Sequence, residues 1–363
     1  MMKRIFKIIL GLIIVTYSGV AYAQTENLSL LYPVYEGSPP LFSESGYFQS
    51  DQKLAREDGV NQYGMPLYFE PKWSSEDSKI GVLIIHGYSA GPLQNVELQK
   101  FLYSKGIASY ALRLPGHGTT TEDLKEKNLS DWENSISGPL AFLKSRCDQV
   151  FVYGVCFGGT LALLAAEEDP EIAGVIQQAA FIKTGYSEYY LYTPLTIFTD
   201  FFHQDLGEIK LPPDPSFNHI SYPVNIVRNN FQIRLGVEKA RRGLDRIAVP
   251  MLSIHSRLDK TADPESEIYL GKMTSTPGLK VLWYGSEHTP LIHPNEAIYS
   301  DILSFLKDPA TSVSSFGTYE KAHTEIVVPT EAPKELRWIN TINCVNIDMS
   351  NSGSRIEWPS QWG

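Results

Sequence analysis

The sequence predicts an α/β fold built on a mostly parallel central sheet with helices on both faces. Short runs that are nearly all apolar recur through residues 65–308 and alternate with stretches of helical spacing. Strands without a polar face are typical of a parallel sheet that is covered on both sides. The composition agrees, because 363 residues with 43% hydrophobic and 20% charged side chains can bury a full core.

The apolar runs mark the expected strands, and the stretches between them mark the helices. We expect strands at residues 66–69, 80–85, 107–112, 150–155, 172–176, 250–254 and 280–283. Helical spacing is found at residues 93–102, 132–143, 161–166 and 296–306. This order alternates strand and helix, as a doubly covered sheet requires.

Residues 183–245 interrupt the alternation with a segment rich in aromatic side chains. We interpret it as a lid over the active site, because insertions commonly enter α/β domains at this position. Tyr189, Tyr190 and Phe201 are its candidate substrate-binding residues. Ordinary packing of a cap would produce the same aromatic composition, so this alternative stays open.

The segments outside the core have weaker patterns. Residues 24–64 are rich in Tyr, Ser, Gly and Pro, and we expect an irregular N-terminal arm. After residue 308 the alternation stops, and residues 309–363 are interpreted as a C-terminal extension with short strands near 325–328 and 336–347.

The N-terminal residues have the pattern of an export signal. A basic start precedes an apolar run at 8–15 and the small-residue site Ala21-Tyr22-Ala23. We expect cleavage before Gln24 and a periplasmic or secreted protein. The alternative is an uncleaved membrane anchor, for which the apolar run is short. The net charge of −10 and the absence of a long Lys/Arg run argue against nucleic-acid partners.

The chemistry of the chain centres on the segment that follows the strand at 150–155. It reads Gly154-Val-Cys156-Phe-Gly158-Gly159 and leads into a helix, which is the layout of a nucleophile elbow. Such a turn is so tight that the neighbours of the nucleophile must lack a Cβ atom. The alternative is a glycine-rich turn in which Cys156 is a small buried hydrophobe.

The strand at 80–85 leads into His86-Gly87 and a loop of small residues. This is where enzymes with a nucleophile elbow place the first donor of an oxyanion hole. We expect the backbone N–H groups of Tyr88 and Phe157 to be the two donors.

A candidate acid and a candidate base follow Cys156 in the chain order that this layout requires. Asp259 follows the strand at 250–254, and His288 follows the strand at 280–283. Asp263 and His293 are the rival acid and base, and we interpret His117 as a loop-packing residue. No Cys/His or His/Glu spacing suggests a metal site, and we expect no cofactor.

From about residue 66 to 306 the chain resembles the α/β-hydrolase superfamily, in the branch of monoacylglycerol lipases, carboxylesterases and serine aminopeptidase-like proteins. The resemblance rests on His86-Gly87, residues 113–118, the elbow, Asp259 and His288. That branch has serine where this chain has Cys156. In this respect the elbow is similar to those of dienelactone hydrolases and polyhydroxyalkanoate synthases. The synthases act on acyl-CoA inside the cell, which an export signal disfavours.

A cysteine nucleophile implies a thioester intermediate, which passes its acyl group to water, amines or thiols. We expect an acyl hydrolase that acts on a small-molecule or lipid ester or thioester with an apolar acyl part, in peripheral contact with membranes. The alternatives are an acyltransferase that uses an envelope acceptor and a binding protein in which the cysteine is inert. Because the nucleophile must stay free, any disulfide should join Cys147 and Cys344.

Overall fold

The computed structural model describes residues 46–61, 64–183, 208–210, 222, 224–257, 259, 261–284, 288, 296–310, 323–324 and 347–348. The chain divides into two units, Met1–Pro39 and Pro40–Gly363, and every described residue belongs to the second unit. The expected signal peptide and the lid residues Tyr189, Tyr190 and Phe201 lie outside the described residues.

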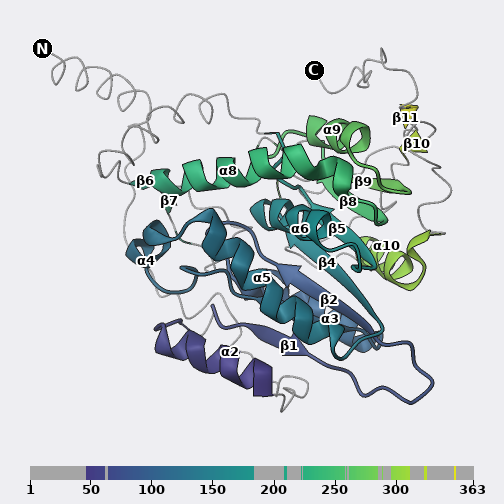
Figure 1. The fold of residues 1–363 in the computed structure, drawn as a ribbon, viewed down its shortest axis with the longest axis horizontal. Coiled ribbons are helices and arrows are strands. Elements are labelled where there is room, and N and C mark those ends of the chain that lie inside the picture. The colour runs from purple at the N-terminus through teal and green to yellow at the C-terminus, as the bar shows by residue number, and fades with distance from the viewer. Residues whose placement is uncertain are drawn as a thin grey trace, which may run out of the picture. The chain divides into compact units, whose positions relative to one another are not determined.

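The core is a seven-stranded, mostly parallel sheet, as the sequence predicts (Figure 1). Its strand order is β1-β3-β2-β4-β5-β8-β9. β1 pairs antiparallel with β3, and the other neighbours pair parallel. The strands are β1 (Leu67–Phe69), β2 (Ile80–Ile85), β3 (Ala108–Leu112), β4 (Gln149–Val155), β5 (Gly174–Gln178), β8 (Met251–Ser256) and β9 (Leu279–Tyr284).

Helices and two small strand pairs complete the described fold. The helices are α2 (Gly46–Glu57), α3 (Val96–Ser104), α4 (Thr121–Glu126), α5 (Leu129–Lys144), α6 (Phe157–Glu168), α8 (Val227–Gly243), α9 (Glu265–Met273) and α10 (Glu296–Lys307). The antiparallel pairs are β6 (Glu208–Lys210) with β7 (Val224–Ile226) and β10 (His323–Thr324) with β11 (Ile347–Asp348). No helix in the described ranges is long and apolar enough to cross a membrane.

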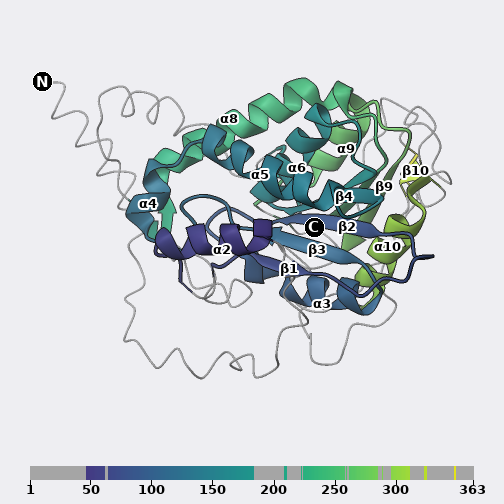
Figure 2. The ribbon, with the colours of Figure 1, turned by 60° about the horizontal axis from the view of Figure 1, so that its bottom comes forward.

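The sheet is buried on both faces, which explains why its strands are almost wholly apolar. Along β2, Leu83 and Ile85 pack into one cluster, and Val82 and Ile84 pack into the other. This alternation follows from the two-residue period of a strand. Helices α5, α6 and α8 cover the first face, while α3 and α10 cover the second (Figure 2).

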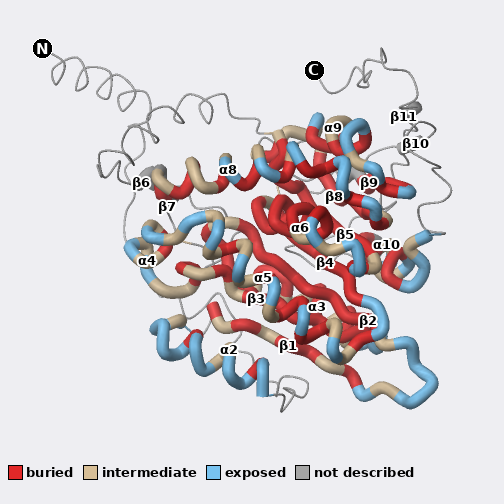
Figure 3. The backbone as a smooth tube through the Cα atoms, in the orientation of Figure 1, coloured by how far each residue is buried: buried red, intermediate tan, exposed pale blue. Residues whose placement is uncertain are grey.

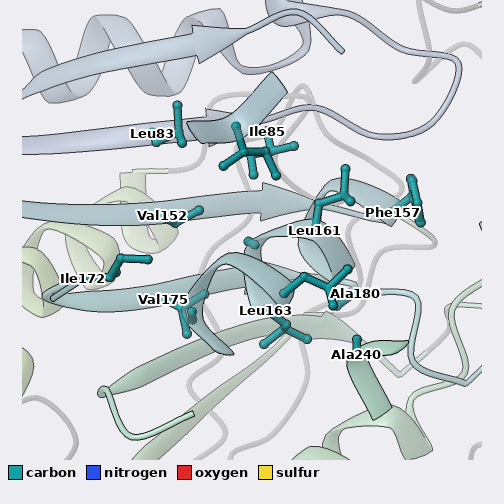
Figure 4. Packing of buried hydrophobic residues seen from close by; sticks show 14 of the residues in the cluster. Leu83, Ile85, Val152, Phe157, Leu161, Leu163, Ile172, Val175, Ala180 and Ala240 are labelled. Atoms are coloured by element: carbon teal, nitrogen blue, oxygen red, sulfur yellow. The ribbon is translucent and has the colours of Figure 1, made fainter. Parts of the chain in front are cut away.

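The first of these clusters supports the end of β4, where the candidate nucleophile lies. Figure 4 shows Leu161 and Leu163 of α6 in the same buried cluster as Val152 of β4 and Val175 of β5. In Figure 3 the central strands and α6 are buried along most of their length. Burying a leucine of this kind contributes roughly 1.5–3 kcal/mol to the free energy of folding. These contacts therefore stabilise the junction of β4 and α6.

Two helices differ from the sequence expectations. α2 lies within the arm that was expected to be irregular, and α8 lies within the expected lid segment. The apolar residues Ile233, Val237 and Ala240 follow helical spacing along α8 and are buried against the domain. At least this part of the segment is therefore fixed to the core.

Cys147, which any disulfide was expected to join to Cys344, is a buried, free thiol. Its sulfur fills the space above Gly81, where an added Cβ atom would lie 2.7 Å from the sulfur. Burial, together with the negative charge of Glu70, raises the pKa of Cys147 to about 12. Cys344 lies outside the described residues. The packing of Cys147 against β2 explains why the thiol points into the core.

Candidate active site

Cys156 lies at the junction of β4 and α6 in a strained backbone conformation. Its φ and ψ angles are 55° and −121°, which a residue with a side chain rarely adopts. The N–H of Cys156 donates to the carbonyl oxygen of Gln178 at 2.8 Å, and its own carbonyl oxygen accepts from the N–H of Gly159 at 2.9 Å. These bonds hold the strained turn between β5 and the first turn of α6.

The two glycines that flank Cys156 allow the turn to close. A Cβ atom added to Gly154 would lie 2.1 Å from the carbonyl oxygen of Gly158. One added to Gly158 would lie 2.4 Å from the carbonyl oxygens of Ile85 and His86. All of these obstacles are backbone atoms, which cannot move aside as a side chain can. The requirement for glycine that the sequence indicates is therefore a geometric one.

Replacing Gly154 with alanine is expected to lower the free energy of unfolding by at least about 1–3 kcal/mol, the usual cost of forcing an extra carbon into a packed interior. The matched control is Gly46→Ala, because an added Cβ atom at Gly46 meets nothing within 4 Å. Urea unfolding of both variants measures the effect. Equal midpoints for the two variants would contradict the geometric account of the turn.

Asp259 and His288 meet beyond the ends of β8 and β9. The His288 Nδ1 atom lies 2.7 Å from the Asp259 Oδ2 atom. The other carboxylate oxygen of Asp259 accepts the N–H groups of Thr261 at 2.8 Å and Ala262 at 2.9 Å. Burial works to raise the pKa of Asp259, but the positive charge of His288 and the hydrogen bonds outweigh it and hold this pKa below its usual range.

An ionised Asp259 fixes the tautomer of His288, because only a protonated Nδ1 can donate to the carboxylate. Burial favours the neutral imidazole, but the charges of Cys156 and Asp259 and hydrogen bonds to both outweigh it. The pKa of His288 is therefore raised well above its ordinary value. The structure thus brings all three residues of the expected triad together.

The rival residues occupy other positions. The Oδ1 atom of Asp263 accepts the N–H of Glu265 at 2.9 Å at the start of α9, and its Oδ2 atom lies 4.0 Å from the Lys183 ammonium group. Asp263 therefore lies in the turn before α9, whereas Asp259 is the carboxylate that pairs with His288. His293 lies outside the described residues.

The loop after β2 lies directly beside the candidate nucleophile. A Cβ atom added to Gly87 would lie 3.4 Å from the Cβ atom of Cys156. Within the described part of the chain, acceptors take the N–H groups of Gly87, Ser89 and Ala90. The N–H of Tyr88 remains as the candidate donor of this loop.

The second expected donor is the N–H of Phe157, the first residue of α6. The first N–H groups of a helix have no acceptor within it, and they carry the positive end of the helix dipole. This N–H lies one residue after Cys156, where the oxyanion of a bound ester would develop. The two predicted donors therefore come from the loop after β2 and from the start of α6.

His117 is fully buried and binds the loop after β2 that carries the predicted donor Tyr88. Its Nε2 atom accepts the N–H of Ser89 at 3.1 Å, and Ser89 has a positive φ of 60°. Burial lowers the pKa of His117 to about 4, so the ring stays neutral and can accept this bond. The role of His117 is thus more specific than the loop packing that the sequence suggested.

Tyr222 also binds the loop after β2 that carries Tyr88, and no pattern in the sequence singles it out. Its N–H donates to the carbonyl oxygen of Ser89 at 2.8 Å. Its hydroxyl group donates to the carbonyl oxygen of Gly116 at 2.9 Å and accepts the N–H of Thr119 at 2.9 Å. An aromatic residue among many gives no sequence signal for such a role, because its partners lie about a hundred residues away in the chain.

The chain belongs to the Alpha/beta hydrolase family, whose model matches residues 82–300. This match spans more than half of the chain and contains all three residues of the candidate triad. The fold and the family match together identify the chain as an α/β hydrolase.

Several relatives are lipases and esterases. A thermostable monoacylglycerol lipase from Bacillus sp. (strain H-257) is 29% identical over 224 residues, which are 59% of this chain and 84% of the relative. A carboxylesterase from Bacillus subtilis (strain 168) is 21% identical over 230 residues, covering 62% and 92%.

Solved structures agree in fold. One, from a study of the metagenome-derived lipolytic enzymes LipS and LipT, has a TM-score of 0.59 and 25% identity and covers 68% of this chain and 99% of its own. The monoacylglycerol lipase of Paleococcus ferrophilus has a TM-score of 0.57 and 17% identity, covering 66% and 97%, and shows likeness of fold.

Proposed function

We propose that the chain is an acyl hydrolase that uses Cys156 as nucleophile, His288 as general base and Asp259 as the group that orients His288. One observation carries this proposal. Cys156 has the strained backbone of a nucleophile elbow and contacts an imidazole whose other nitrogen lies 2.7 Å from a buried carboxylate. That arrangement of nucleophile, base and orienting acid is the one that acyl transfer requires.

The residues define a balanced reaction for an ester. His288 takes the thiol proton of Cys156, and the sulfur attacks the ester carbonyl carbon. The oxyanion is stabilised by the N–H groups of Tyr88 and Phe157, each of which typically contributes roughly 10²–10³ in rate. The C–O bond then breaks, and His288 gives its proton to the leaving alcohol. The product of this half-reaction is an acyl thioester on Cys156.

Hydrolysis of the thioester repeats these roles with water. His288 takes a proton from water while the water oxygen attacks the thioester carbonyl carbon. The C–S bond breaks, the carboxylic acid leaves, and the proton on His288 returns to the sulfur. Asp259 keeps the imidazole in the required tautomer throughout.

We further propose that the substrate is a lipid ester with an apolar acyl chain and that the enzyme acts on it at a membrane surface. The relatives named as monoacylglycerol lipase and carboxylesterase support this substrate class. Tyr189, Tyr190 and Phe201 belong to the aromatic segment that we propose lines the acyl pocket. A rank order of hydrolysis across p-nitrophenyl esters of increasing chain length tests the proposal.

The wild type is expected to prefer the longer esters, and the combined substitution of Tyr189, Tyr190 and Phe201 with alanine should shift the preference to short ones. The short-ester rate serves as the internal control, because it depends on the triad and not on the acyl pocket. An unchanged chain-length profile would contradict a pocket lined by these residues. A wild type that hydrolyses no ester would contradict the function itself.

We also propose that the protein is exported and that the leader is removed before Gln24. The basic start, the apolar run and the Ala-Tyr-Ala site support this proposal. N-terminal sequencing of the protein purified from the cell envelope or the medium should begin at Gln24. A chain that still begins with Met1 there would refute removal of the leader.

A further inference from the structure

His255 is a buried histidine on β8 that lies behind the candidate triad. Its side chain is fully buried, and both ring nitrogens face oxygen acceptors. The Nδ1 atom lies 2.6 Å from the Glu267 Oε1 atom, and the Nε2 atom lies 3.0 Å from the carbonyl oxygen of Ala262. The Nε2 atom also lies 3.4 Å from the Asp259 Oδ2 atom. A ring that faces acceptors on both sides must donate from both nitrogens, so it is an imidazolium.

Glu267 supplies the second charge and belongs to α9. It is 3% exposed, and its Oε1 atom accepts from the Gln177 side chain at 2.9 Å, while its Oε2 atom accepts from the Ser253 hydroxyl. A buried carboxylate is costly unless a cation and hydrogen bonds compensate it. His255 is the cation that compensates Glu267, and the side chains around them complete the hydrogen bonds.

We propose that Glu267 and His255 form a buried ion pair of positioning residues that holds the Asp259 carboxylate in place for His288. This inference rests on the proposed function, because Asp259 has a role in catalysis only within the triad.

His255 constrains Asp259 in two ways. It lies directly against the same carboxylate oxygen, Oδ2, that pairs with His288. It also donates to the carbonyl oxygen of Ala262. The N–H of the same alanine donates to the other carboxylate oxygen of Asp259. His255 therefore contacts Asp259 through its carboxylate and Ala262 through its backbone.

Carboxylates and histidines alternate from Glu267 through His255 and Asp259 to His288. Glu267 and Asp259 are the carboxylates that act on His255, and they come from α9 and from the loop after β8. Burial favours the neutral ring, but the two carboxylates outweigh it and raise the pKa of His255 to about 9. Since this pKa lies above the ordinary value, the pair stabilises the fold fully below about pH 6.5 and loses its contribution as the pH rises through 9.

The same array reaches the turn that carries Cys156. The Gln177 side chain donates to Glu267 and accepts the N–H of Ala180 at 2.7 Å. The next residue, Gln178, accepts the N–H of Cys156. A change at Glu267 can therefore displace Asp259 and Cys156 relative to each other.

The test compares Glu267→Gln with the control Glu265→Gln. Glu265 is on the same helix, but it is exposed and pairs with Lys183. Partners that orient an active group from behind typically contribute roughly 10–100-fold in metal sites. We expect Glu267→Gln to lower kcat by about tenfold or more with KM unchanged, because it touches no substrate. Glu265→Gln should match the wild type.

A second readout uses the wild-type protein labelled with ¹⁵N-histidine. NMR should show His255 protonated on both ring nitrogens at pH 7.5, and Glu267→Gln should return it to a neutral ring. A neutral His255 in the wild type would overturn the inference. So would an unchanged kcat in Glu267→Gln.

The failure of this inference is distinguishable from failure of the proposed function. If the triad is correct and the ion pair is not, Cys156→Ala abolishes activity while Glu267→Gln retains it. If the proposed function is wrong, Cys156→Ala retains the activity of the wild type, whatever the state of His255.

Discussion

Replacing Cys156 with alanine is expected to lower ester hydrolysis by roughly 10⁴–10⁶-fold, the loss that follows removal of a nucleophile from a catalytic triad. The reason is that neither His288 nor the oxyanion donors can form a covalent intermediate. Initial rates with p-nitrophenyl esters, together with circular dichroism to verify folding, measure this effect. Because Cys156 is partly exposed at the end of β4, its truncation should leave the core intact.

The matched control is Cys147→Ala, which removes the other described thiol. Cys147 is buried against β2 and precedes β4, at the opposite end of that strand from Cys156, so its variant should retain the wild-type rate. Cys156→Ser should keep weak activity, because a site arranged for sulfur places the imidazole for a longer bond. A Cys156→Ala variant with more than a few per cent of the wild-type rate would show that this residue is not the nucleophile.

The second large effect is expected for His288→Ala, measured by alkylation of Cys156 with iodoacetamide across a range of pH. In the wild type, the raised pKa of His288 means that an imidazolium is present at neutral pH to stabilise the thiolate. Without it, a thiol is only a few per cent thiolate at pH 7. Labelling should therefore slow by roughly 10–30-fold at pH 7 and recover near pH 8.5, where an unassisted cysteine ionises.

Cys147 does not disturb this measurement, because burial raises its pKa to about 12 and shields it from the reagent. Asp259→Asn should fall between the wild type and His288→Ala, since the imidazole remains but loses its oriented tautomer. Identical pH profiles for the wild type and His288→Ala would mean that His288 does not activate Cys156, and the triad would fail even though the fold stands.

The fold was accessible from the sequence because its strands are buried on both faces. Runs such as residues 80–85 have no polar side, and only a doubly covered sheet explains them. α8 was missed because the aromatic residues before it dominated the interpretation of residues 183–245. Its apolar positions do follow helical spacing, so a closer reading of periodicity would have found it.

In the candidate site, too, the residues that follow strands could be predicted, and the residues held by contacts between segments far apart in the sequence could not. Cys156, Asp259 and His288 each follow a strand, and the ends of parallel strands meet at one edge of a sheet, so local patterns could place them. The partners of His255 could not be found in this way. Glu267 reaches it from α9, and the Gln177 side chain that binds Glu267 comes from β5, 90 residues earlier in the chain. Hydrogen bonds across such separations leave no local pattern in a single sequence.

Mass spectrometry of the acyl-enzyme shows whether Cys156 carries the acyl group. The protein is mixed with a p-nitrophenyl ester, quenched in acid within the first turnover, and weighed intact and as peptides. We expect one acyl group per chain, attached to Cys156, removed by neutral hydroxylamine as a thioester is, and absent from Cys156→Ala. Turnover with the acyl group on another residue, or an acyl group that persists in Cys156→Ala, would contradict this expectation.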